Sequence, residues 1–161
     1  MKKYLLGLMA VAVLMACNTM TSAERAEQRM KVAQQIEQML AEKHYTVDVK
    51  MMYPRGGRAE NVTSNYSLEI KGDTLVSYLP YFGRAYNVPY GGGKGLNFSA
   101  SVSSYEMKKE KNGKTYIMMR ADNGEDVIDY QLEIFDNGQT TIDVTARERE
   151  PISYSGEIIV K

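Results

Sequence analysis

Hydrophobic and polar residues alternate along the chain with two different periods. Between residues 23 and 43 apolar residues recur every three or four positions, which is the spacing of one face of an α-helix. Thr21 and Glu24 at its start form a capping-box pattern, in which both side chains bind free backbone amides of a helix. From residue 45 onward the period is two, which is typical of β-strands with one buried face. The chain therefore predicts one helix followed by strands.

Turn residues divide the period-two region into about eight segments. In the clearest segment Ile128, Tyr130 and Leu132 alternate with polar residues, as in a strand that faces a core on one side and water on the other. Pro151 is expected to open the last strand, because proline is tolerated at the start of a strand. The predicted strands are residues 45–51, 66–71, 74–79, 96–102, 115–121, 126–136, 139–147 and 152–160.

Three Asn-Gly pairs separate neighbouring strand segments: Asn112-Gly113, Asn123-Gly124 and Asn137-Gly138. Asn-Gly is the preferred sequence of type I′ turns, which need positive φ at both central residues and join antiparallel strands. Because helices do not alternate with strands, a parallel sheet is not expected. The strands should follow one another as an antiparallel meander.

The predicted fold is mainly β (α+β), with an N-terminal helix followed by about eight antiparallel strands. One slim helix cannot cover eight strands that each have a wet and a dry face. The sheet should therefore curl on itself, as a barrel or a two-layer sandwich, with the helix across an end or an open side. The pattern leaves open whether side chains fill the interior or enclose a ligand cavity.

The N-terminal residues have the pattern of a secretion signal. Lys2 and Lys3 precede an uncharged apolar run, Leu5 to Ala16, which is shorter than the roughly 20 residues of a membrane-spanning helix. The run ends in Leu14-Met15-Ala16-Cys17, which resembles a lipobox, although Met15 is bulkier than usual. We expect residues 1–16 to be a signal peptide, residues 17–22 a lipidated tether and residues 23–161 a single domain. The alternatives are a signal cleaved near a cysteine by coincidence and an uncleaved amphipathic start.

Cys17 is the only cysteine, so no intramolecular disulfide can form, and acylation gives this lone thiol a use. Acyl chains on Cys17 would hold the protein on a membrane. Loss of the signal lowers Lys+Arg from 20 to 18 against 20 Asp+Glu, a net charge of −2. A nearly neutral domain with mixed charges predicts no nucleic-acid partner.

One segment, residues 78–95, departs from the strand pattern and is called the aromatic loop. It holds five aromatic residues, two prolines and five glycines, and it is longer than a hairpin needs. In one interpretation it is a recognition surface for a sugar or peptide, with Arg84 able to pair with a carboxylate or phosphate. In the other, its aromatic side chains plug one end of the barrel. The candidate binding residues are Tyr78, Tyr81, Phe82, Arg84, Tyr86 and Tyr90.

The stretch Tyr78 to Tyr86, with the glycine-rich link and Leu96-Asn97-Phe98, resembles the signature of a lipoprotein family of Bacteroides-type bacteria. The shared domain of that family has no assigned function, and the resemblance covers nearly the whole chain. It implies a Gram-negative envelope location and supplies no catalytic or binding residues. Residues 18–22 contain no acidic run of the kind that tends to mark surface export in such bacteria. This favours an outer-membrane location facing the periplasm.

Residues with catalytic chemistry are sparse. His44 is the only histidine and lies near the predicted C-terminal end of the helix, where a cation complements the helix dipole. Zinc sites built from histidine and cysteine are therefore not expected, and no Gly-x-Ser-x-Gly motif occurs. Asp122, Glu125, Asp126 and Asp129 lack the spacing of an EF-hand and are interpreted as a hairpin turn with a solvated strand face. We nominate no catalytic residue, metal site or cofactor.

Three functional hypotheses follow from the sequence. The first is a non-catalytic binding or accessory module, anchored through Cys17, that contacts a glycan, lipid, peptide or envelope protein through the aromatic loop. The second is a purely structural envelope protein whose loop is a core plug. The third is a small hydrolase that uses His44, Asp126 or Asp129.

Overall fold

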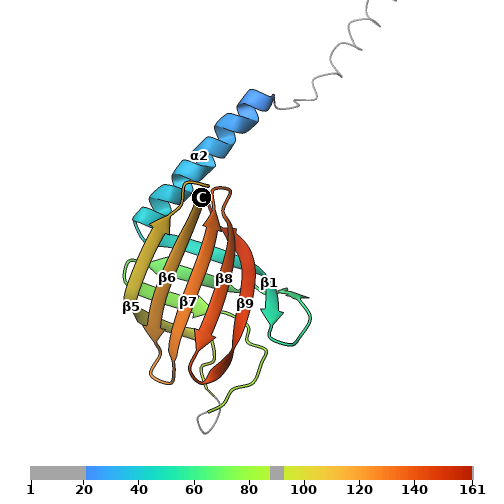
Figure 1. Cartoon of the computed structure of the whole chain (residues 1–161), viewed down its shortest axis with the longest axis vertical. Helices are drawn as coiled ribbons and strands as arrows, with labels where there is room; N and C mark the ends of the chain where they lie inside the picture. The colour runs from blue at the N-terminus through green and yellow to red at the C-terminus, as the bar shows by residue number, and fades with distance from the viewer. Residues whose placement is uncertain (1–20, 88–92, 161) are drawn as a thin grey trace, which may run out of the picture.

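A computed structural model describes residues 21–87 and 93–160. The predicted signal peptide, Cys17 and Tyr90 lie outside the described residues. Helix α2 spans Ser22–Ala41 and is followed by strands only (Figure 1). The strands are β1 His44–Pro54, β2 Glu60–Asn61, β3 Ser67–Lys71, β4 Thr74–Tyr78, β5 Asn97–Lys109, β6 Lys114–Asp122, β7 Val127–Phe135, β8 Gln139–Ala146 and β9 Arg149–Ile158.

The strands form one closed antiparallel barrel. The order along the sheet is β2-β1-β3-β4-β5-β6-β7-β8-β9, and β1 also pairs with β9. Eight strands close the barrel, and the two-residue β2 is an extra strand on β1. The prediction of a helix followed by an antiparallel meander is confirmed, and the sheet closes as a barrel. Helix α2 lies at one end of the barrel and the aromatic loop at the other (Figure 1). These are called the helix end and the loop end.

The three Asn-Gly hairpins form as predicted, but the predicted turn type is wrong. Gly113, Gly124 and Gly138 have positive φ, whereas none of the three preceding asparagines does. The asparagine side chains instead accept backbone hydrogen bonds, such as Gln139 N to Asn137 Oδ1 at 3.0 Å. A type I turn followed by a left-handed glycine needs only one positive φ, and the asparagine side chain stabilises it.

Several strands differ from the prediction. Strand β5 continues to Lys109, well past residue 102. Strand β2 was not predicted, because a two-residue strand carries no period. Strand β9 begins at Arg149, so that Pro151 lies inside it. The register between β8 and β9 shifts at this point, and such an irregularity accommodates a residue without an N–H.

The alternating side chains that point inward fill the barrel. Ile128, Tyr130, Leu132 and Ile134 on β7 are all at most 1% exposed. They belong to one continuous hydrophobic cluster with residues from every other long strand and from α2. The predicted alternation of wet and dry faces is therefore confirmed for β7, whereas β5 has no buried residue after Phe98, and the interior of the barrel is filled by side chains.

Helix α2 contacts the barrel only through its C-terminal half. The capping box is present, with Glu24 N 3.3 Å from Thr21 Oγ1 and Thr21 N 2.7 Å from Glu24 Oε2. Ile36 and Leu40 are buried, whereas residues 22–31 are all exposed, Met30 to 60%. The predicted apolar stripe is thus buried along only part of its length. The N-terminal half projects from the barrel (Figure 1) by about 15 Å, at about 1.5 Å per residue.

Strand β5 pairs with a different neighbour in each half. Its residues 97–101 pair with β4, and from Val102 onward the strand pairs with β6 alone. The last turns of α2 lie at the unpaired side. Lys109 Nζ is 2.8 Å from Glu37 Oε1, and Lys43 Nζ lies 4.7 Å from the centre of the Tyr105 ring. The helix therefore stands where another strand would otherwise pair.

Candidate functional site

The aromatic loop closes the loop end of the barrel from within. Leu79 and Leu96, at the two ends of the loop, are buried in the core. The Tyr154 hydroxyl donates to the Pro80 carbonyl at 2.6 Å, and the buried Ser77 hydroxyl donates to the Leu96 carbonyl at 2.7 Å. Burial raises the pKa of Tyr154 above its ordinary value, so the phenol stays protonated as a donor. The seal is thus made by leucines, and among the described aromatic residues of the loop Tyr81 alone packs against the core, so the aromatic plug of the second interpretation is not what closes this end.

A short part of the loop, residues 81–86, runs alongside β9 and is called the strap. Ala85 lies opposite Arg149, and two backbone bonds flank this pair: Tyr86 N to Glu148 O at 2.8 Å and Glu150 N to Arg84 O at 3.0 Å. The Tyr81 hydroxyl lies 2.8 Å from Arg84 O and 3.2 Å from Glu150 O. These bonds fix the backbone of the strap.

A buried ion pair lies beneath the strap. Arg149 Nε is 3.8 Å from Asp126 Oδ2, and the two side chains are only 8% and 1% exposed. The Asp126 carboxylate also accepts from the amides of Arg147 at 3.1 Å and Glu148 at 3.2 Å, which hold the β8–β9 turn. The Arg149 guanidinium in turn lies 5.5 Å from the centre of the Tyr81 ring. The buried ion pair, the β8–β9 turn and the strap are thus joined in one network.

The outer side of the strap is open to solvent. The exposed fractions are 63% for Phe82 and 64% for Tyr86, and Arg84 is exposed as well. Arg84 and Tyr86 flank Ala85 in extended backbone, so both face outward, away from the side on which Arg149 is buried. Among residues 21–87 and 93–160 no carboxylate lies within ion-pair distance of Arg84. The strap therefore presents aromatic rings and a cation on a fixed backbone.

The predicted binding residues that the structure describes differ in position and in exposure. Phe82, Arg84 and Tyr86 lie on the exposed strap. Tyr81 is half-buried and serves as a hydrogen-bond donor within the loop. Tyr78 lies at the end of β4, 47% exposed, with its ring stacked on Tyr66 at 4.9 Å between centroids. The described part of the loop thus has a packed inner side and a solvent-exposed outer side.

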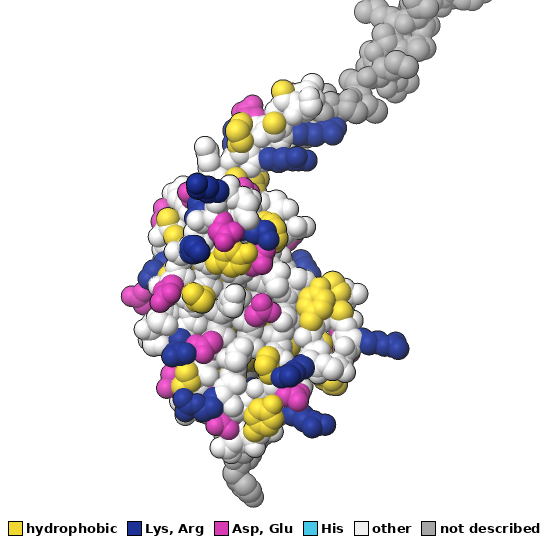
Figure 2. Space-filling model, viewed as in Figure 1, with side chains coloured by type: hydrophobic (Ala, Val, Ile, Leu, Met, Phe, Trp, Pro, Cys, Tyr) yellow, Lys and Arg dark blue, Asp and Glu magenta, His cyan; other side chains and the backbone are white. Residues whose placement is uncertain are grey.

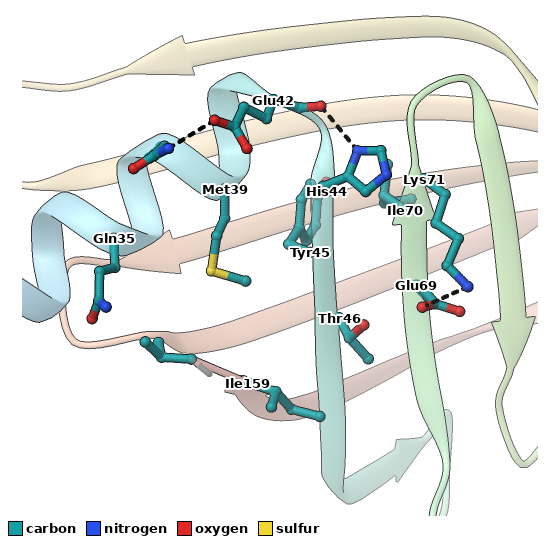
Figure 3. Close-up of a pocket in the computed structure, with 12 residues that line it drawn as sticks. Gln35, Met39, Glu42, His44, Tyr45, Thr46, Glu69, Ile70, Lys71 and Ile159 are labelled. Atoms are coloured by element: carbon teal, nitrogen blue, oxygen red, sulfur yellow. Dashed lines mark hydrogen bonds and ion pairs between the residues drawn. The ribbon is translucent and has the colours of Figure 1, made fainter.

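A second candidate site is a groove of about 510 Å³ at the helix end (Figure 3). It lies between α2, β1, β3 and the last residues of the described chain. Its apolar lining includes Met39, Tyr45 and Ile159. Four of its polar side chains pair with one another: Gln38 with Glu42 at 2.8 Å and Lys71 with Glu69 at 2.9 Å.

His44 is the side chain of this groove with the most reactive chemistry. Its Nδ1 lies 3.3 Å from the carbonyl oxygen of Glu42, the residue that caps the helix. Asp126 lies in the β6–β7 turn at the loop end, across the barrel from His44 (Figure 1). Asp129 makes a paired contact with Arg120, at 2.6 and 3.0 Å. The fold therefore does not bring together the residues of the hydrolase hypothesis.

Outside residues 1–20, 88–92 and 161, no three His, Cys, Asp or Glu side chains are grouped as metal ligands. Within the same part of the chain, no helix has the length and apolar character needed to cross a membrane.

The sequence did not reveal Asp126 and Arg149 as partners. Asp126 was interpreted as part of a solvated turn, but it is 6% exposed, and Arg149 is 7% exposed. The local pattern gives no signal of this pair, since the two residues lie in different hairpins that only the folded sheet brings together. The sequence gives one indication that Arg149 is buried, because this residue lies two residues before Pro151 in an otherwise alternating segment.

Comparison with known proteins identifies the family. The profile of a domain of unknown function, DUF4251, matches residues 26–158. The chain belongs to the DUF4251 family. A solved structure of a DUF4251 protein from Bacteroides eggerthii DSM 20697 is similar, with a TM-score of 0.63 over 80% of this chain and 87% of that one. At 15% identity that DUF4251 structure supports the fold alone. No curated protein matches the chain.

Membership in DUF4251 confirms the predicted resemblance to a domain of unknown function found in Bacteroides-type bacteria. Helix α2 from Ala26 onward and the whole barrel up to Ile158 fall within the matched range. The DUF4251 description carries no activity, so any function must be argued from the surface of the protein.

Proposed function

We propose that this chain is a lipid-anchored protein of the bacterial cell envelope that binds a partner through the outer side of its strap. The observation that carries the proposal is the combination of exposure and order at Phe82, Arg84 and Tyr86. Their side chains are solvated, while the backbone beneath them is held by the bonds to β9. A surface ordered before binding loses little conformational entropy when a partner arrives.

The kinds of residue support a binding role. Aromatic residues and arginine dominate the energetics of many interfaces, because they combine large apolar area with directed hydrogen bonds. Isolated exposed apolar side chains are common on protein surfaces. Here two exposed rings and a guanidinium without an ion-pair partner among the described residues occur within five consecutive residues of a fixed segment.

The proposed anchor sets the direction in which the strap faces. Cys17 stands five residues before Ser22, where α2 begins. The exposed half of α2 then adds about 15 Å before the barrel starts. The strap lies at the loop end, across the barrel from α2 (Figure 1). The strap would therefore face away from the membrane that holds Cys17. If that membrane is the outer one, the strap faces the periplasm.

The anchor is tested by metabolic labelling with a radioactive fatty acid, in the native chain and in Cys17→Ser. We expect label in the membrane fraction for the native chain alone. Equal label in both, or a mature protein free in the medium, contradicts the anchor and leaves the strap to be tested separately.

The strap is tested by native mass spectrometry of the full-length protein against glycans, fatty acids and peptides. We expect Tyr86→Ser to abolish a complex that Met118→Ser retains. Met118 is a suitable control because it is 53% exposed and lies on β6, away from the strap. If both variants bind as the native chain does, the strap is not the contact surface.

The second candidate is a purely structural role, in which the loop only seals the barrel. The buried Leu79 and the bond from Tyr154 to Pro80 favour it. In that case Tyr86→Ser alters no binding, while Leu79→Ala still costs about 2–5 kcal/mol of stability. Loss of binding with unchanged stability in Tyr86→Ser decides against it.

A further inference from the structure

The strap does not stand alone on the outer surface of the barrel. One edge of β9 pairs first with the strap, at Arg149, and then with the end of β1, where Pro54 lies opposite Ile152. Ile152 is the third residue after Arg149 along β9, a distance of about 10 Å at about 3.3 Å per residue. The strap and the β1–β2 turn are therefore neighbours.

The β1–β2 turn adds two more arginines and a tyrosine to this surface. Arg55 and Arg58 are exposed, and Tyr53 is 40% exposed with its hydroxyl 3.2 Å from Ser155 Oγ. In the described part of the chain no acidic group lies within 4.0 Å of either arginine's side-chain nitrogens. Figure 2 shows Lys and Arg side chains among hydrophobic ones on this side of the molecule, over the β1–β2 turn and the loop. We call the set Tyr53, Arg55, Arg58, Arg84 and Tyr86 the arginine–tyrosine face.

Carboxylates also lie at the margin of this face. Glu150 accepts a bond from the Arg84 amide through Oε2, at 3.1 Å, and Glu60 lies on β2, opposite Met52. The three arginines of this face and the two glutamates at its margin give a local charge near +1. A dense polyanion would be repelled by Glu60 and Glu150. A ligand with separate single charges and many hydroxyls can instead use both signs, because carboxylates accept hydroxyl bonds.

We propose that the arginine–tyrosine face binds an acidic glycan, one whose sugar units carry carboxylates. Arginine pairs with a carboxylate through two parallel bonds, which suits a singly charged, planar group. The flat tyrosine rings offer surfaces for the apolar faces of the sugar rings, and Glu60 and Glu150 accept from sugar hydroxyls. This inference rests on the proposed function, since Arg84 and Tyr86 belong to the strap.

Isothermal titration calorimetry of the full-length protein in detergent micelles tests the inference, with trigalacturonic acid as the probe. We expect binding that weakens at least about tenfold with the methyl ester of the same trisaccharide, because the ester keeps the sugar rings and removes the charges. Arg84→Gln and Arg55→Gln should each weaken binding of the acid about tenfold, as expected for loss of a charged hydrogen-bond pair. Arg29→Gln, an exposed arginine on α2, is the matched control and should change nothing.

Two results overturn the glycan assignment. Equal binding of the acid and its ester removes the role of the arginines. Binding of tetraglutamate but not of trigalacturonic acid, lost in Arg84→Gln and Tyr86→Ala, replaces the glycan by an acidic peptide and leaves the proposed function intact. If no ligand of any class depends on Arg84 or Tyr86, the proposed function fails together with the inference. Unchanged thermal melting of each variant shows that it is folded.

Discussion

The two ends of the barrel are closed in different ways. At the helix end, Ile36 and Leu40 of α2 are buried against the core, a contact made by apolar burial. At the loop end, apolar residues are joined by a buried ion pair and by hydrogen bonds from Tyr81 and Tyr154. Apolar burial is non-directional and tolerates sliding, whereas hydrogen bonds fix distances and angles. The loop end is therefore the one at which exposed side chains can be presented in a defined geometry.

The largest expected effect comes from the ion pair at the loop end. Asp126→Ala leaves the Arg149 guanidinium buried without an anion, which costs about 3–5 kcal/mol. Guanidinium denaturation at pH 7 measures the loss. Asp129→Ala is the matched control, since it breaks an ion pair whose side chains are about half exposed, and such pairs contribute at most about 1 kcal/mol. Similar losses in the two variants would contradict the role of burial.

The helix end is tested by Leu40→Ala. Removing this buried side chain should cost about 3 kcal/mol, from lost burial and the cavity left behind. Amide exchange of the strap should stay unchanged relative to global unfolding, because no hydrogen bond reaches from Leu40 to the loop end. Met30→Ala, at a position 60% exposed on the projecting half of α2, should change stability by less than about 0.5 kcal/mol.

The strap itself is tested by Tyr81→Phe. Loss of the hydroxyl removes its bonds to the carbonyls of Arg84 and Glu150, at a cost of about 1 kcal/mol. The amides of Tyr86 and Glu150 should exchange faster, whereas those of α2 should not. Exchange followed by NMR measures this difference. Tyr86→Phe removes an exposed hydroxyl instead, and equal acceleration in that variant would show that Tyr81 has no special part.

The smallest expected effect is on the pH dependence of stability. Stability should change little near neutral pH and should fall above pH 10. Burial raises the pKa of Tyr130 and of Tyr154 above the ordinary value of about 10. In the unfolded chain these phenols ionise near pH 10, while in the fold they stay protonated. Their contribution to stability is therefore complete below pH 10 and is lost as the pH rises above it.

Denaturation midpoints measured between pH 8 and pH 11.5 should fall above pH 10, and less steeply in Tyr130→Phe. An identical slope in that variant would show that Tyr130 does not contribute to the alkaline loss.

Most of the strands were predictable because buried and exposed residues alternate along them. The helix was predictable from its cap and its apolar spacing, and the hairpins from their Asn-Gly pairs. Each of these signals lies within a few consecutive residues. The projecting half of α2 was not predictable, since Ala26 and Met30 continue the apolar stripe although nothing covers them.

Contacts between distant residues were not predictable. Closure of the barrel pairs Val47 with Ile158, and it requires Gly156, where a Cβ would collide with the backbone carbonyl of Asp48. Nothing in the residues around Gly156 indicates that close approach. The same holds for the strap, because Ala85 meets Arg149 only after the barrel has closed.

The position of α2 beside the second half of β5, which pairs with β6 alone, has a consequence for solubility. A strand edge with free N–H and C=O groups is a template on which other chains can add strands and aggregate. The contacts of Glu37 with Lys109 and of Lys43 with Tyr105 keep the helix at this edge. A chain without this helix would therefore expose an aggregation-prone strand edge and leave a gap in its core. Helix α2 thus both leads from the N-terminus to the barrel and protects the free edge of β5 against self-association.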